Sequence, residues 1–96
     1  MKVSIIVPTL NEESIIEKTL TEIRQLSPYE LIVSDGGSVD GTLLIANRFS
    51  HRVITGCSGR ALQMNAGAKE ATGDILLFLH ADNRLEPDSY LKCTSV

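Results

Sequence analysis

Four short apolar runs alternate with segments of helical periodicity, and this alternation limits the possible folds more than any other feature of the chain. The runs are rich in β-branched residues and too short for helices, so we predict that each forms a strand. They are "KVSIIVP" (2–8), "ELIVSD" (30–35), "RVIT" (52–55) and "DILLFLH" (74–80). Strands that are apolar on both sides are typical of parallel sheets with helices on both faces. The expected fold is therefore an α/β domain, a parallel-sheet three-layer sandwich.

A helix is expected between the first two strands. Ile16, Leu20 and Ile23 recur there at the spacing that places side chains on one helical face. Asn11 is the expected N-cap of this helix, and the helix should end before Pro28.

Two further helices are expected to connect the remaining strands. A short helix over 43–49 follows "DGGSVDGT", with Ser38 or Asp40 as its N-cap. A longer helix should run over 60–72, with Gly73 as the glycine that closes its carboxyl end. Each pair of consecutive predicted strands is thus joined by a helix, as a parallel sheet requires.

Size and charge exclude several classes of protein. The 96 residues are 43% apolar and contain no linker or repeat, which favours a single domain over 1–96. The formal net charge of −3 argues against nucleic acid as a partner. The longest apolar stretch, 75–79, is too short to span a bilayer, and no targeting pattern follows Met1, so we expect a cytoplasmic protein. Cys57 and Cys93 lack CxxC spacing, which argues against a disulfide framework.

The polar residues that suggest chemistry fall where the predicted strands end. They lie in 8–12, 35–38, 56–60 and 80–84, and Pro8 is expected to end the first strand because it lacks an N–H donor. In a parallel sheet the carboxyl ends of the strands share one edge, and ligands bind beyond it where the strand order reverses. We therefore expect one ligand site built from these four segments.

The expected ligand is neither a Rossmann dinucleotide nor a P-loop nucleotide. The first strand is not followed by a GxGxxG turn, and the sequence contains no GxxxxGK motif followed by Ser or Thr. Asp35 could accept hydrogen bonds from a base or ribose, or it could cap the "GGS" turn. Asp82 could hold a hard divalent cation that binds a diphosphate, or it could form a turn. The two acids together favour a nucleotide-diphosphate site.

Four linked motifs carry a family resemblance. They are "SIIVPTLNEE", "LIVSDGGSVDGT", "GRALQMNAGAKEATGD" and "ILLFLHADNRL". In this order they resemble the N-terminal nucleotide-binding half of a family-2 glycosyltransferase of the GT-A fold. Within the family, the chain is most similar to the radical-SAM/selenodomain-associated transferase subgroup. The resemblance implies a nucleotide-sugar donor, a divalent cation (Mn or Mg), and an inverting transfer in which an acceptor hydroxyl attacks the anomeric carbon.

The resemblance also implies roles for particular residues. Asp82 matches the last acid of the family's Asp-x-Asp motif and should bind the metal. His80 stands where that motif has its first acid, and ribose contact and metal contact both remain open for it. An imidazole suits manganese better than magnesium, which prefers oxygen ligands. The positions that match donor nucleotide-binding residues are Pro8, Thr9, Asn11, Glu12, Asp35, Arg60, Asn65 and His80.

The sequence leaves the catalytic base and the acceptor unassigned. None of its acids matches the family's general base, which we expect beyond residue 96. We therefore expect the chain to be a truncated part of a longer enzyme, inactive alone, with an acceptor that could lie near a membrane. One alternative is a fragment that covers its sheet edge by forming a homo-oligomer. Another is a nucleotide-binding module without turnover, which the His80 departure favours.

Overall fold

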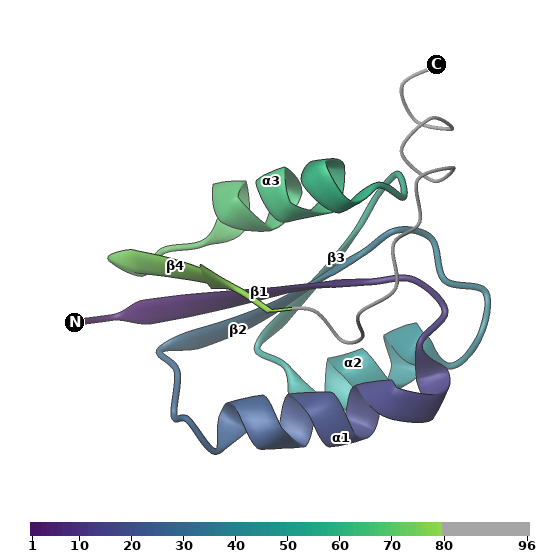
Figure 1. Cartoon of the computed structure of the whole chain (residues 1–96), viewed down its shortest axis with the longest axis horizontal. Helices are drawn as coiled ribbons and strands as arrows, with labels where there is room; N and C mark the ends of the chain where they lie inside the picture. The colour runs from purple at the N-terminus through teal and green to yellow at the C-terminus, as the bar shows by residue number, and fades with distance from the viewer. Residues whose placement is uncertain (80–96) are drawn as a thin grey trace.

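The structure, a computed structural model, describes residues 1–79 and alternates strands with helices along the chain (Figure 1). The four strands pair in parallel in the order β3-β2-β1-β4. The expected α/β class with a parallel sheet is confirmed. The elements are β1 (Val3–Thr9), α1 (Glu13–Arg24), β2 (Glu30–Asp35), α2 (Thr42–Phe49), β3 (Arg52–Thr55), α3 (Arg60–Glu70) and β4 (Ile75–Phe78).

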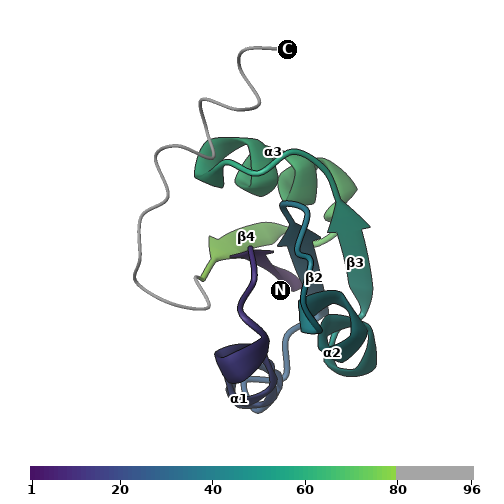
Figure 2. The same ribbon diagram turned by 90° about the vertical axis from the view of Figure 1, so that its right-hand side faces the viewer.

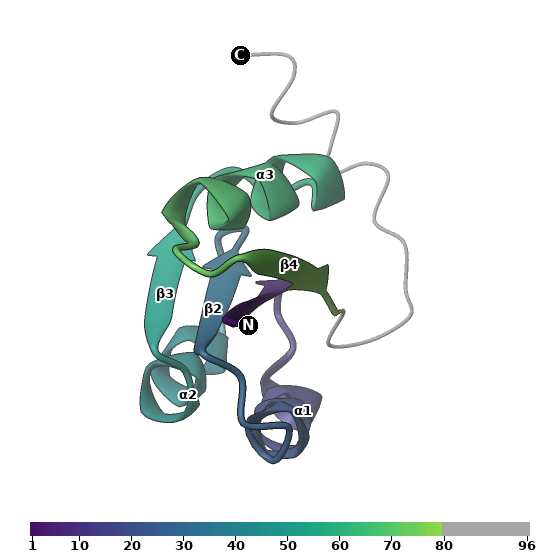
Figure 3. The same ribbon diagram turned by 90° about the vertical axis from the view of Figure 1, so that its left-hand side faces the viewer.

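The helices form two layers, one on each face of the sheet. Figures 2 and 3 show α1 and α2 together on one face and α3 alone on the other. Within residues 1–79 none of the helices has the length and apolar character that crossing a membrane would require. The core between the sheet and the α1/α2 layer consists of Ile5, Val7, Ile16, Leu20, Ile23, Leu31, Val33 and Ala46. The predicted three-layer sandwich is therefore present.

The order in which the chain adds strands to the sheet reverses direction beside β1. The connections through α1 and α2 carry the chain from β1 to β2 and β3, and the connection through α3 then carries it back to β4 on the other side of β1. In open α/β sheets such a reversal leaves a crevice at the carboxyl ends of the two strands that flank it. The expected ligand edge is therefore the edge at which β1 ends.

Pro8 does not end β1, contrary to the sequence prediction. The strand continues to Thr9, which pairs with Asp35 of β2. Residues two apart in a strand direct their peptide groups to the same side. The carbonyl of Ile6 faces β4, because it accepts a hydrogen bond from the backbone N–H of Leu79. Pro8 therefore turns its nitrogen toward the β4 side, beyond the last β1–β4 pair, and its missing N–H removes no bond to β2.

Gly73 does not close the preceding helix, which ends at Glu70 rather than Thr72. The backbone at Ala71 is already extended, and Gly73 lacks the positive φ of a capping glycine. Its small size serves a close contact instead, because a Cβ atom there would lie 2.5 Å from the hydroxyl oxygen of Ser4. The Gly73 N–H donates to that hydroxyl at 2.9 Å, which fixes the entry into β4.

β4 is less buried than its apolar sequence predicted. Ile75, Leu76 and Leu77 are each about 40% exposed. The cause is the position of the strand, because among the described residues β4 pairs only with β1.

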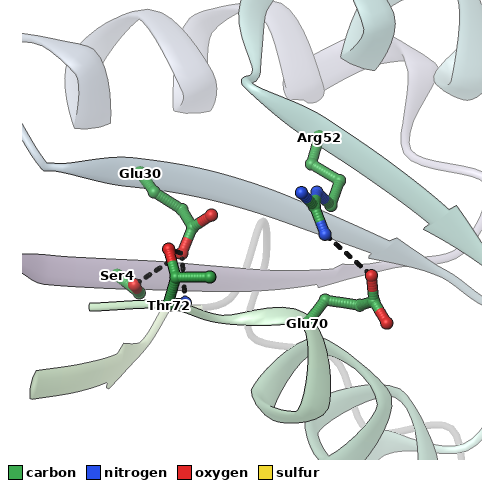
Figure 4. Close-up of polar contacts among 5 residues, drawn as sticks. All are labelled: Ser4, Glu30, Arg52, Glu70 and Thr72. Atoms are coloured by element: carbon green, nitrogen blue, oxygen red, sulfur yellow. Dashed lines mark hydrogen bonds and ion pairs between the residues drawn. The ribbon is translucent and has the colours of Figure 1, made fainter. Parts of the chain in front are cut away.

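The amino ends of the strands are joined by the buried carboxylate of Glu30. Its Oε1 accepts hydrogen bonds from the Ser4 hydroxyl at 2.7 Å and from the Thr72 backbone N–H at 2.7 Å (Figure 4). Burial raises the pKa of Glu30, but the hydrogen bonds from Thr72 and Ser4, with the nearby charge of Arg52, hold it below its usual value. Beside this group, Arg52 forms a half-exposed ion pair with Glu70 at 2.8 Å.

We predict that Glu30 makes the fold sensitive to acid. A carboxyl whose pKa is lowered by folding stabilises the protein above its unfolded pKa of about 4.3, and this contribution is lost as the pH falls through the folded pKa. Between about pH 5.5 and about pH 3, the free energy of unfolding should therefore fall more for the wild type than for Glu30→Gln. Urea titrations at several pH values measure this, with Glu17→Gln on the exposed side of α1 as the control. Parallel curves for wild type and Glu30→Gln would contradict the assignment.

We also predict that Gly67 is required for the contact between α3 and the sheet. A Cβ atom at Gly67 would overlap the side chain of Ile6, which is fully buried. Gly67→Val should lower the free energy of unfolding by about 1–3 kcal/mol through overpacking. Ala61→Val, at an exposed position of the same helix, should lower the free energy of unfolding by only a few tenths of about 1 kcal/mol. Urea unfolding followed by circular dichroism compares the two, and equal losses would show that the close contact is unimportant.

Candidate functional site

The carboxyl ends of three strands form one row at the predicted ligand edge. The sheet register places Asp35 of β2 between Thr9 of β1 and Thr55 of β3. Backbone hydrogen bonds extend the row by one step, from the Gly36 N–H to the Thr9 carbonyl at 2.9 Å and from the Gly56 N–H to the Asp35 carbonyl at 3.0 Å. The structure thus brings the predicted residues Thr9 and Asp35 into direct contact.

Asp35 is buried and uses both carboxylate oxygens within the protein. Its Oδ1 accepts from the Thr9 hydroxyl at 2.7 Å and from the Ser38 hydroxyl at 2.6 Å. Its Oδ2 accepts from the backbone N–H groups of Gly37 at 2.9 Å and Ser38 at 2.7 Å. The side chain is 1% exposed. A carboxylate has about four lone-pair positions, and these four hydrogen bonds use all of them. The turn-capping role, one of the two alternatives, is the one present here.

Asn11 joins the loop after β1 to the loop after β2. Its backbone N–H donates to the Ser38 hydroxyl at 2.8 Å, and its side-chain oxygen accepts from the Val39 N–H at 2.8 Å. Asn11 has a φ of 51°, a left-handed conformation that asparagine tolerates better than most residues. The prediction that Asn11 caps α1 is therefore wrong, because its side chain bonds across to the neighbouring loop and the N-cap position falls on Glu12.

A second set of contacts joins the same two loops through Asp40. The Glu12 N–H donates to the Thr42 hydroxyl at 2.8 Å, and this hydroxyl donates to Asp40 Oδ1 at 2.5 Å. The Glu13 N–H reaches the other oxygen of Asp40 at 3.3 Å. Gly41, rather than Ser38 or Asp40, occupies the N-cap position of α2, but the Asp40 carboxylate still accepts the Thr42 N–H at 2.9 Å.

Gln63 is a buried polar residue of α3 that the sequence interpretation missed. Its amide nitrogen donates to the carbonyls of Thr9 and Ser34, each at 2.8 Å, and its oxygen accepts from the Gly59 N–H at 2.9 Å. One side chain therefore ties β1, β2 and the start of α3 together. A signal was present, because Gln63 and Gly67 are four residues apart and share the face of α3 that touches the sheet.

The remaining predicted site residues are divided between this edge and other places. Pro8 is buried beside Ser34 in the register, and Arg60 is exposed as the first residue of α3. Asn65 is exposed on the side of α3 opposite Gln63, so the structure does not bring it to Thr9 and Asp35. His80 and Asp82 lie outside the described residues. Within residues 1–79 there is no cluster of three or more His, Cys, Asp or Glu side chains that could hold a metal ion.

Backbone N–H groups of the loops after β1 and β2 donate hydrogen bonds to acceptors within the protein. Every N–H described above at this edge already has an acceptor, in the loop after β1 as in the loop after β2. They belong to Asn11, Glu12, Glu13, Gly36, Gly37, Ser38 and Val39. The backbone of these residues can therefore offer a ligand carbonyl oxygens but no N–H groups, which suits hydrogen-bond donors and cations better than phosphate.

A parallel sheet between two helical layers, with polar residues at its carboxyl edge, places the chain in the class of three-layer α/β domains. Comparison with known families gives the particular family. The profile of glycosyl transferase family 2 matches residues 4–94, and the chain belongs to this family.

Characterised relatives include several glycosyltransferases. A PGL/p-HBAD biosynthesis glycosyltransferase of Mycobacterium tuberculosis is 42% identical over 93 residues, covering 85% of this chain and 36% of the relative. Glycosyltransferase AglE of Haloferax volcanii is 35% identical over 91 residues, covering 83% of this chain and 30% of the relative. The chain thus spans about a third of the length of these relatives.

A solved structure of the same fold contains a nucleotide and a metal. Glucosyl-3-phosphoglycerate synthase from M. tuberculosis, in complex with Mn²⁺, uridine diphosphate and glucosyl-3-phosphoglycerate, superposes with a TM-score of 0.76. The two proteins are 30% identical, and the match covers 84% of this chain and 33% of the synthase. This likeness confirms the GT-A fold class that the sequence motifs indicated.

We predict that Gln63 is essential to the shape of this edge. Gln63→Ala removes three hydrogen bonds to buried backbone groups, so the free energy of unfolding should fall by about 2–4 kcal/mol. Asn65→Ala removes a side-chain amide from the exposed side of the same helix and should change stability by less than about 0.5 kcal/mol. Chemical denaturation measures both, and a loss as small as that of Asn65→Ala would show that Gln63 does not hold the edge together.

Proposed function

We propose that the chain is the donor-binding part of a metal-dependent, inverting glycosyltransferase that uses a nucleotide-diphosphate sugar. The observation that carries the proposal is that backbone N–H groups of the loops after β1 and β2 already donate within the protein. Many nucleotide-binding domains hold phosphate on free N–H groups at the start of a helix. Here the N–H groups of Glu12, Glu13 and Thr42, at the starts of α1 and α2, are bound to Thr42 and Asp40, so the diphosphate would gain from positive charge supplied by another source.

A divalent cation fits this requirement. The described loops offer carboxylate and carbonyl oxygens, which are the ligands that hard cations prefer. Asp82 would hold the cation, and His80 would be a second ligand or a ribose contact. When bound, the cation would neutralise the diphosphate as negative charge develops on the leaving group. Mn²⁺ and uridine diphosphate in the glucosyl-3-phosphoglycerate synthase complex support this choice.

The chain's own residues would bind and orient the donor. Pro8, Thr9 and Asn11 belong to the loop after β1, at the strand-order reversal where the nucleoside would lie. Asp35 would hold this loop to the loop after β2 through the Thr9 hydroxyl. Arg60, at the start of α3, would place its guanidinium near the phosphates. Glu12 and His80 complete the proposed donor-binding set, from which Asn65 is left out because it lies on the side of α3 opposite Gln63.

The reaction would be a direct displacement. An acceptor hydroxyl would attack the anomeric carbon of the sugar, its proton would pass to a general base, and the nucleoside diphosphate would leave from the opposite side. That geometry inverts the anomeric centre. The base is expected in the part of the relatives that this chain does not cover, and the relatives' names place their acceptors among quite different molecules.

A nucleotide-binding module without turnover is the second candidate function. The observation in its favour is His80, which replaces an acid of the metal motif. Incubation with UDP-glucose and Mn²⁺ separates the two, because the enzyme releases uridine diphosphate and the module does not. The assay uses the gene product that carries this chain, because the chain covers only about a third of the length of its relatives.

We predict that uridine diphosphate binds only in the presence of a divalent cation. Calorimetry with Mn²⁺ should show saturable binding, and the same titration in chelator should show a loss of at least about tenfold, because phosphates otherwise meet a net negative protein. Asp82→Asn should abolish the difference between the two titrations, whereas Glu17→Gln, on α1, should preserve it. Equal affinity of the wild type in Mn²⁺ and in chelator would refute the metal role.

A further inference from the structure

The first turns of α1 and α2 converge on one carboxylate. Both helices begin at the same end of their layer, after the carboxyl ends of β1 and β2 (Figure 1). Asp40 Oδ2 accepts the Glu13 N–H from the first residue of α1 at 3.3 Å. Asp40 Oδ1 accepts the Thr42 N–H from the first residue of α2 at 2.9 Å. The same oxygen also accepts the Thr42 hydroxyl, which in turn holds the Glu12 N–H.

This carboxylate occupies the place where such folds commonly bind an anion. The start of a helix carries about half a positive charge and unsatisfied N–H donors, so it attracts phosphate. Two such starts meet at Asp40. Hydrogen bonds from the Thr42 hydroxyl and from backbone N–H groups hold the pKa of Asp40 below its usual value, so the group is an anion at neutral pH.

We propose that Asp40 is a specificity-determining residue that excludes phosphate groups from the starts of α1 and α2 and thereby makes nucleotide binding depend on a cation. The inference builds on the proposed function, which requires that the diphosphate find its positive charge elsewhere. It assigns the cause of that requirement to one side chain. Asp40 needs no contact with the nucleotide for this, because it acts by occupying the donors and by repelling a second anion.

The proposal predicts a gain of binding when the charge at residue 40 is removed. Asp40→Asn keeps an oxygen near the N–H groups but removes the charge. Asp40→Ser introduces a smaller uncharged side chain of a type that caps helices. Either variant should bind phosphate groups at the starts of α1 and α2 without any metal. The expected increase in affinity is about two- to fivefold, the range of charge–dipole effects at a helix end.

The test uses inorganic pyrophosphate in the presence of chelator, with the whole chain. Affinity is measured by titration, and the site is located by the shifts of the Glu13 and Thr42 backbone amide resonances. Glu22→Gln removes the same charge from the exposed side of α1 and is the matched control. Thermal unfolding of each variant confirms that it is folded, and Asp40→Ser replaces Asp40→Asn if the latter is not.

Two results would overturn the proposal. They are unchanged metal-free affinity in the folded Asp40 variant and an equal gain in Glu22→Gln. A gain confined to the Asp40 variant, with shifts at the Glu13 and Thr42 amides, supports it. The outcome is separate from that of the proposed function, which fails if uridine diphosphate does not bind the wild type with Mn²⁺.

Discussion

The side-chain amide of Gln63 is the interaction on which the geometry of the carboxyl edge depends. It binds the carbonyls of Thr9 and Ser34, at the ends of two adjacent strands, and accepts an N–H from the turn that begins α3. Thr9 and Ser34 are buried, so a partner for their carbonyls within the protein matters to stability. Gln63 thus ties the start of α3 to the ends of β1 and β2, which are already paired with each other, and the loops that follow the two strands start from fixed points.

The loops that leave these fixed points are joined to each other by two similar relays. In one, an N–H of the loop after β1 donates to the Ser38 hydroxyl, which donates to Asp35. In the other, an N–H donates to the Thr42 hydroxyl, which donates to Asp40. Both relays run from a backbone donor to a buried or helix-capping carboxylate. The edge is therefore ordered without a ligand. The backbone N–H groups that order it are groups to which a phosphate could otherwise have bound.

Much of the fold could be predicted because it depends on local patterns. The bounds of β2 and β3 agree with the predicted runs, and β2 is buried over its whole length. The site was harder to predict because its bonds join distant residues. Asn11 looked like a helix cap but bonds to Val39, 28 residues away. Gln63 was missed, because sharing a helix face with Gly67 does not show that its amide reaches two strands.

The strand order also bears on how the chain folds during synthesis. β1 is made first, yet it lies between β2 and β4, and its pairing with β4 joins Val3 to Ile75. Distant pairings form late because the intervening chain must lose its entropy before the contact stabilises it. One side of β1 therefore stays open to water, and to other unfolded chains, until β4 leaves the ribosome. The crevice between these two strands is a late product of folding, so a ligand cannot help to nucleate the domain.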